Sequence, residues 1–243
     1  MSTKKSMKHL FQAVKGVALI GLLTGLSLLV NAQDFSKSFK VLPDAGSLEV
    51  LAKTGSITVV PAEGNSIQVT ARHAGNNINV TQATLQGKVK VEVTNDSPVD
   101  LVITVPASTS LDVLCVKCGV TVKGLRGAIK ASTSEGDIQL TGIRSALVEA
   151  RSMSGSVSFS GEVLPSGSYF LKSFSGRVDA ALPAEAKFKL DATSVRGGIE
   201  IKPEDFQLTM QKQTAQFVHG FVGSGGATVT LWTQEGSIRV RKR

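Results

Sequence analysis

One short pattern, [ST]-x-x-G-x-[IV], recurs along the second half of the chain and constrains its fold more than any other feature. Five segments match it: TSEGDI, SMSGSV, SFSGRV, SVRGGI and TQEGSI, which begin at Thr133, Ser152, Ser173, Ser194 and Thr233. Their glycines are Gly136, Gly155, Gly176, Gly197 and Gly236. The first four are separated by 19, 21 and 21 residues, and the last follows after 39. A fixed period of about 20 residues indicates stacked repeats. We expect FVHGFV, around Gly220, to be a degenerate copy in the gap.

The residues on both sides of each motif alternate between apolar and other side chains. Ile129, Ala131 and Thr133 share one phase before Gly136, and Ile138 and Leu140 continue it afterwards. A period of two indicates β-strands. The motif's Ser or Thr therefore lies on the apolar face, where we expect its hydroxyl to bond the backbone of the turn that it enters. The glycine then allows a positive φ at the corner.

Each period makes two short strands and two turns, which cannot bury an apolar face alone. We therefore predict an all-β, single-stranded β-solenoid, a parallel β-helix or β-roll-like stack of ~20-residue coils. An antiparallel sandwich of short hairpins is the alternative, because it also places turn signals every 8–12 residues or so. The constant register of the motif favours the solenoid.

The N-terminal 32 residues are typical of a signal peptide. Four lysines precede an apolar run over residues 16–30, and the small Ala32 follows. The alternative is an uncleaved membrane anchor, although typical spans need about 20 residues. Cleavage would leave 23 basic and 19 acidic residues. We predict an exported protein of the periplasm or cell surface.

The rest of the chain divides into two continuous regions. Residues 33–110 form a looser β-rich region, including LEVLAKTGSITVV, which either blunts the first edge of the stack or is an independent domain. Residues 111–243 hold the solenoid repeats. Residues 203–216 break the period, and we favour a hairpin there over a short helix.

Two cysteines occupy repeat positions. In CVKCGV, Cys115 takes the Ser/Thr place and Cys118 the glycine place. Residues three apart face opposite sides of a straight strand, but across a corner they can approach disulfide distance. The hypotheses are a structural disulfide, which export permits, or two free buried thiols. A redox or zinc role is disfavoured because no helix pattern or second cysteine pair follows.

The sequence indicates no catalytic site, no cofactor and no metal site. Only His73 and His219 remain after the leader, neither in a catalytic motif, and we place His219 in a turn or on the surface. Asp137, Asp179 and Asp191 occupy different places in the repeat, so we expect no convergent carboxylates. The closing RVRKR is interpreted as a solvated chain end rather than an anion-binding patch. We predict no nucleic-acid partner.

Several segments resemble the bacterial DUF4097 family of candidate adhesins. They are TSEGDIQLTG, SMSGSVSFSG, SFSGRVDA and the closing GFVGSGGATVTLWTQEGSIRV, and the resemblance extends over residues 35–240. It implies a β-solenoid or β-roll exposed in the envelope, with no catalytic residues to transfer. The departures are the corner at Cys115 and the segment after Pro203.

Three functions remain open. The first is a non-enzymatic, adhesin-like or scaffold protein that binds an envelope protein or surface glycan through its outward residues, among them Gln139, Glu149, Arg151, Lys172, Arg177, Asp179, Lys189 and Asp191. The second is an envelope-stress regulatory partner, and the third a carbohydrate-active β-helix enzyme. Open solenoid ends also invite self-association.

Overall fold

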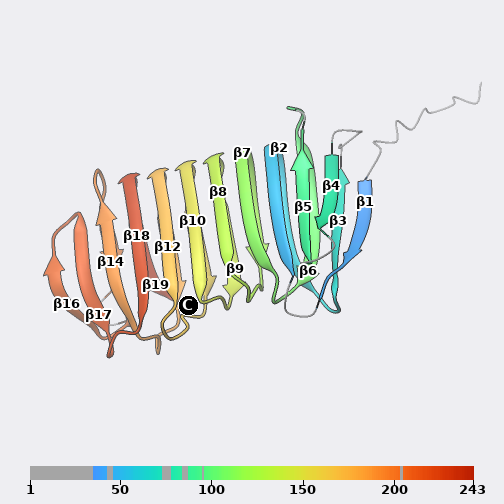
Figure 1. The fold of residues 1–243 in the computed structure, drawn as a ribbon. Coiled ribbons are helices and arrows are strands. Elements are labelled where there is room, and N and C mark those ends of the chain that lie inside the picture. Colours follow the sequence, from blue (N-terminus) through green and yellow to red (C-terminus); the bar gives the residue numbers. More distant parts are fainter. Residues whose placement is uncertain (1–34, 43–45, 73–77, 84–86, 95, 203–204) are drawn as a thin grey trace, which may run out of the picture. The chain divides into compact units, whose positions relative to one another are not determined.

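The computed structural model describes residues 35–243 except 43–45, 73–77, 84–86, 95 and 203–204. The predicted signal peptide of residues 1–32 and His73 lie outside the described residues. The described chain is built from β-strands, which stack as rungs in two ladders that we call front and back (Figure 1). The predicted all-β solenoid is confirmed.

The front ladder contains, in spatial order, β4 (Ile78–Ala83), β5 (Lys88–Val93), the first halves of β2 (Ser47–Ala62) and β7 (Ser110–Lys123), β8 (Ile129–Glu135), β10 (Leu147–Ser154), β12 (Ser168–Ser175), β18 (Ala227–Glu235), β14 (Phe188–Ser194), β17 (Phe217–Val222) and β16 (Leu208–Gln213). The strands from β5 to β14 are parallel to one another, whereas β4, β17 and β16 pair antiparallel with their neighbours.

The back ladder contains β1 (Phe35–Lys40), β3 (Ser66–Arg72), β6 (Val99–Pro106), the second halves of β2 and β7, β9 (Ile138–Ile143), β11 (Val157–Gly161), β13 (Val178–Leu182), β19 (Ile238–Lys242) and β15 (Ile199–Ile201). Here β1 and β3 are the antiparallel strands at the end. Antiparallel strands thus cover the N-terminal end of both ladders.

The two ladders pack their alternate side chains into one core. Ile129 on β8 and Leu140 on β9 are each 1% exposed, and burying one such aliphatic side chain contributes about 1.5–3 kcal/mol. The rings of Phe159 on β11 and Tyr169 on β12 meet inside, with centroids 5.5 Å apart. The Tyr169 hydroxyl donates to the Ser145 carbonyl at 2.9 Å and accepts the Leu164 N–H at 2.8 Å. Burial raises the pKa of this phenol, although the Leu164 hydrogen bond opposes the shift.

The motif hydroxyls join neighbouring rungs at the corners. Ser152 donates to the Gly136 carbonyl at 2.9 Å, and Ser173 donates to the Gly155 carbonyl at 2.8 Å. The expectation that each hydroxyl bonds its own turn is therefore wrong for Ser152 and Ser173, whereas Thr133 contacts both its own turn, at the Glu135 carbonyl, and the preceding rung, at the Cys118 carbonyl. The Gly136 N–H donates to the Ser154 carbonyl of the next rung. The Ser152 hydroxyl then provides a hydrogen-bond donor for the Gly136 carbonyl.

Glycine is required at these corners because neighbouring backbones approach closely. A Cβ on Gly155 would lie 2.2 Å from the Gly136 carbonyl oxygen, and one on Gly176 would lie 2.3 Å from that of Gly155. Gly136, Gly155, Gly176 and Gly236 also have positive φ, between 133° and 157°. Gly197 does not have a positive φ, but a Cβ added to it would lie 1.9 Å from the Gly236 carbonyl oxygen. Close approach is thus the constraint that all five share.

The rungs do not stack in sequence order at the C-terminal end. Ser173 aligns with Thr233, and Thr233 aligns with Ser194. Strand β18, red in Figure 1, therefore lies between β12 and β14. The expectation that FVHGFV is a degenerate corner is wrong. The segment forms the antiparallel strand β17, in which Gly220 pairs with Leu190 within a ladder. The hairpin expected in residues 203–216 contributes only its first arm, β16, from that segment. Its second arm is β17, so the hairpin extends to Val222.

The cysteines lie in the same corner register. Cys115 aligns with Thr133 on one side and Ala52 on the other, and Cys118 aligns with Gly55. The structure joins the two cysteines in a disulfide with Cα atoms 5.9 Å apart. Both residues are buried. The bond closes the corner in the middle of β7, where other rungs have a hydroxyl and a glycine.

Candidate functional site

The outward residue immediately before each corner forms a continuous row on the front ladder. We call it the pre-corner row, and it runs in spatial order through Leu114, Ser132, Arg151, Lys172, Trp232 and Thr193. These side chains face outward because the inward positions on both sides of them are buried. Phe217 on β17 extends the row beyond Thr193.

Arg151 and Lys172 lie directly opposite each other in this row. Like charges at paired positions on neighbouring strands are unfavourable. Each cation is turned towards an aromatic ring: the Arg151 guanidinium lies 4.9 Å from the Phe170 ring centroid, and the Lys172 ammonium 4.3 Å from that of Trp232. Such contacts are worth about 0.5–1 kcal/mol at exposed sites. Two adjacent cations flanked by rings form a positively charged, partly apolar surface.

A hollow of about 270 Å³ opens on this surface beside Arg151 and Lys172. Ser132 and Ser134 on β8 line it, between Leu114 on one side and Met153 on the other. Leu114 and Met153 are 56% and 57% exposed and form the apolar walls of the hollow. The hollow combines hydroxyls, cations and apolar walls in one place.

Aromatic side chains continue along the front ladder at β17. Phe217 stacks on His219 with ring centroids 6.5 Å apart, and Phe221 meets His219 edge-on. His219 Nδ1 contacts the Asp191 carboxylate. His219 therefore lies in a strand, half-buried, and not in a turn. Asp191 faces the front, whereas Asp179 lies on the back ladder.

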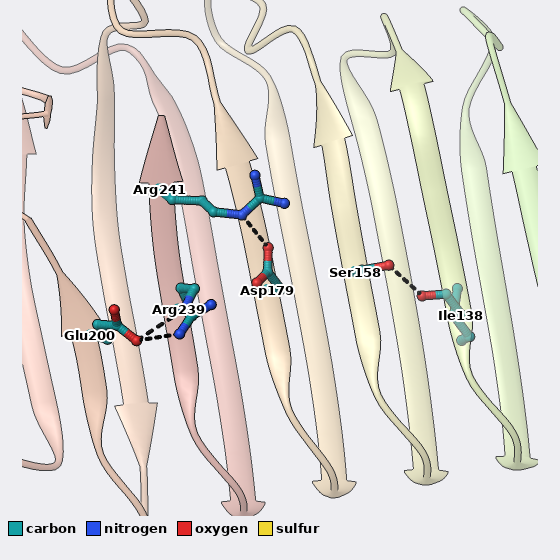
Figure 2. Close-up of polar contacts among 6 residues, drawn as sticks. All are labelled: Ile138, Ser158, Asp179, Glu200, Arg239 and Arg241. Atoms are coloured by element: carbon teal, nitrogen blue, oxygen red, sulfur yellow. Dashed lines mark hydrogen bonds and ion pairs between the residues drawn. The ribbon is translucent and has the colours of Figure 1, made fainter. Parts of the chain in front are cut away.

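The back ladder presents charged pairs instead. Arg239 reaches Glu200 through both Nε and Nη2 at 2.9 Å, and Arg241 Nε lies 3.2 Å from Asp179 (Figure 2). Ser158 on β11 donates to the Ile138 carbonyl of the neighbouring strand β9 at 3.4 Å. Arg239 and Arg241 of RVRKR thus belong to β19, which pairs with both β13 and β15. Residues 241–243 are exposed, as expected for a solvated chain end, but Arg239 and Arg241 also pair with carboxylates.

The predicted outward residues fall on both ladders. Glu149, Arg151, Lys172, Lys189 and Asp191 lie on the front, whereas Gln139 and Asp179 lie on the back and Arg177 at the corner before β13. Gln139, Arg177 and Asp179 line a second, polar depression with Asp137 and Arg241. The prediction missed Trp232, although its place one residue before Thr233 is the place of Lys172 before Ser173.

Comparison with protein families agrees with this geometry. Residues 132–241 match the family model of Toastrack DUF4097. The chain carries a Toastrack DUF4097 region. The resemblance seen in the motifs is confirmed there, over a shorter segment than residues 35–240. The Toastrack region includes Ser132, Arg151, Lys172 and Trp232, so most of the pre-corner row belongs to it.

Solved structures of two proteins are similar to this chain at low sequence identity. A candidate cell adhesion protein from Clostridium sporogenes ATCC 15579 is 9% identical, with a TM-score of 0.56 over 87% of this chain and 100% of its own. A candidate adhesin from Bacteroides fragilis NCTC 9343 is 11% identical, with a TM-score of 0.38 over 87% of this chain and 97% of its own. No curated protein matches the sequence. The first similarity supports the fold alone.

Within residues 35–243, less the gaps given above, no group of three or more His, Cys, Asp or Glu side chains is arranged to hold a metal ion. The same part of the chain contains no helix long and apolar enough to cross a membrane.

Proposed function

We propose that this protein is an exported, non-enzymatic binding protein of the cell envelope, adhesin-like in role, whose front ladder is its ligand-binding face. The observation that carries the proposal is the direct pairing of Arg151 with Lys172 beside the rings of Phe170 and Trp232. Like charges at paired positions cost stability. Glu149 already pairs with Arg151, whereas Lys172 has no carboxylate partner in the described part of the chain, and an anionic ligand would supply one. The adhesin-like character of fold relatives supports the same reading.

The rigid backbone suits this role. Every inner front strand is hydrogen-bonded on both edges, so outward side chains are held at a spacing of about 4.8 Å. A ligand therefore meets a pre-organised surface and loses little affinity to ordering of the protein.

Location and binding can be tested separately. Cell fractionation with surface proteolysis should find the protein outside the cytoplasm; a cytoplasmic pool alone would overturn export. Cross-linking in intact envelopes should then capture a partner with the wild type and with Arg177→Gln, but not with the double variant Lys172→Gln, Trp232→Ala. Equal capture by all three would overturn the front-face assignment. A single dominant membrane protein as partner would instead favour the regulatory role.

A further inference from the structure

We infer that the hollow beside Ser132 binds the carboxylate of an acidic glycan, with Arg151 and Lys172 as its cations. This inference rests on the proposed function and names its ligand class. It starts from three adjacent strands in register. Ser132 on β8 pairs with Leu114 on β7 and with Arg151 on β10. Because serine is much shorter than either neighbour, the middle strand leaves a hollow between two walls.

The polar groups that reach the hollow are available to a ligand. The Ser132 and Ser134 hydroxyls make no hydrogen bond within the described part of the chain, and Lys172 forms no ion pair there. Arg151 is held by Glu149, with Nε and Oε1 2.8 Å apart, and keeps half of its side chain exposed. A guanidinium, an ammonium and two hydroxyls are donors, which is the set that a carboxylate requires.

The surroundings favour a glycan over an acidic peptide. A peptide gains affinity on a sheet mainly by adding a strand to a free edge, and both edges of β8 are occupied by β7 and β10. Recognition must therefore come from side chains. Ser132 and Ser134 line the hollow. The rings of Phe170 and Trp232 contact its two cations, Arg151 and Lys172. Rings near hydrogen-bonding groups suit the mixed apolar and hydroxylated faces of sugar rings.

The test is titration of the purified protein with short oligomers of galacturonate, mannuronate and hyaluronan, each beside its methyl-esterified form. Emission from Trp232, the single tryptophan, is the site-specific readout, since a carboxylate that draws Lys172 away exposes the ring face. We expect at least one acidic oligomer to bind, and its neutral ester to bind at least about tenfold more weakly, as loss of a charge-assisted hydrogen bond predicts.

Three variants distinguish this site from general charge attraction. Lys172→Gln should weaken binding about tenfold, and Ser132→Leu, which fills the hollow without altering charge, should do the same. Arg177→Gln removes an equal charge away from the front ladder and should change affinity by less than about twofold. Unchanged circular dichroism and melting temperature establish that each variant is folded.

Four results would overturn the inference: no binding of any acidic oligomer, equal binding of the esters, equal weakening by Arg177→Gln, or equally tight, Lys172-dependent binding of polyglutamate. The last would assign the hollow to acidic peptides. None of these results would overturn the proposed function, which is tested separately by cross-linking of the front ladder to a partner in intact envelopes.

Discussion

Ser194 donates its hydroxyl to the carbonyl of Gly236, 42 residues further along the chain, at 2.8 Å. The equivalent bond of Ser173 reaches back 18 residues, to Gly155. The difference arises because β18 follows β14 in sequence but precedes it in space. Thr233 completes the series by donating to Gly176 at 2.9 Å. Each corner hydroxyl therefore bonds the glycine of the rung that precedes it in space, whatever the order of the two rungs in sequence.

Deletion of residues 227–243 tests this order. The deletion removes β18 and β19, which connect β12 and β13 to β14 and β15. We expect the chain beyond β13 to become sensitive to limited proteolysis, as followed by mass spectrometry, and the melting temperature to fall. Replacement of residues 208–222, the outermost hairpin, by a short Gly-Ser linker is the control and should leave β14 protected. Continued protection of β14 in the first variant would contradict the observed order.

Ser173→Ala removes a buried corner hydroxyl. The Gly155 carbonyl would lose its partner in a site where Ser173 is 0% exposed. We expect the free energy of unfolding to fall by about 1–3 kcal/mol in urea denaturation. Ser175→Ala, two residues on and exposed, should change it by less than about 0.5 kcal/mol. Similar effects of both substitutions would show that the corner hydroxyl has no special role.

Gly155→Ala places a methyl group where the backbone of the preceding rung lies, at Gly136. Its Cβ would be 2.2 Å from the Gly136 oxygen, and the residue has φ 146°. Overpacking and backbone strain together predict a loss of roughly 3 kcal/mol or more, measured by urea denaturation. Gly119→Ala is the matched control, since nothing lies within 4 Å of its Cβ. A tolerated Gly155→Ala would show that the corners can separate.

Tyr169 provides a pH-dependent observable, because it is the only tyrosine in the chain. Burial raises its pKa above the ordinary value of 10.0. A raised pKa means that folding favours the neutral phenol, so this contribution to stability is present below pH 10 and is lost as pH rises past the folded pKa. Phenolate absorbance should give a midpoint above 10 in the folded protein and a lower one in denaturant. The reverse order would contradict the buried position.

The disulfide is tested by mass spectrometry of the purified protein. Without reductant, Cys115 and Cys118 should resist alkylation even after unfolding; with reductant, both should be labelled. Two labelled thiols in the absence of reductant would reject the bridge. The double variant Cys115→Ser, Cys118→Gly restores the repeat pattern, and we expect it to fold with a loss of at most about 2 kcal/mol, because the closed loop is short.

The corner pattern was sufficient to predict the solenoid because the same physical problem recurs in every rung. Thr133 and Ser152 each stand at the inner end of a strand, before a glycine that accommodates a neighbouring carbonyl. The alternation around them then separates core from surface. For the same reason, Arg151 and Lys172 could be assigned to the outside from sequence alone.

The order of the rungs could not be predicted, because the motifs are interchangeable. Ser194 and Thr233 offer the same hydroxyl at the same place, so either rung can donate to Gly176. Likewise, the hollow depends on the residue that stands before Thr133 being shorter than its neighbours on the two adjoining rungs. That comparison requires knowledge of which rungs are neighbours, and Trp232 joins Lys172 only once β18 is placed beside β12.

The inserted rung has a consequence for how the chain reaches its native state. During synthesis β14 is complete before β18 exists, and β14 carries the corner chemistry that β12 accepts. Strand β18 therefore takes its place between β12 and β14 after both of them have been synthesised.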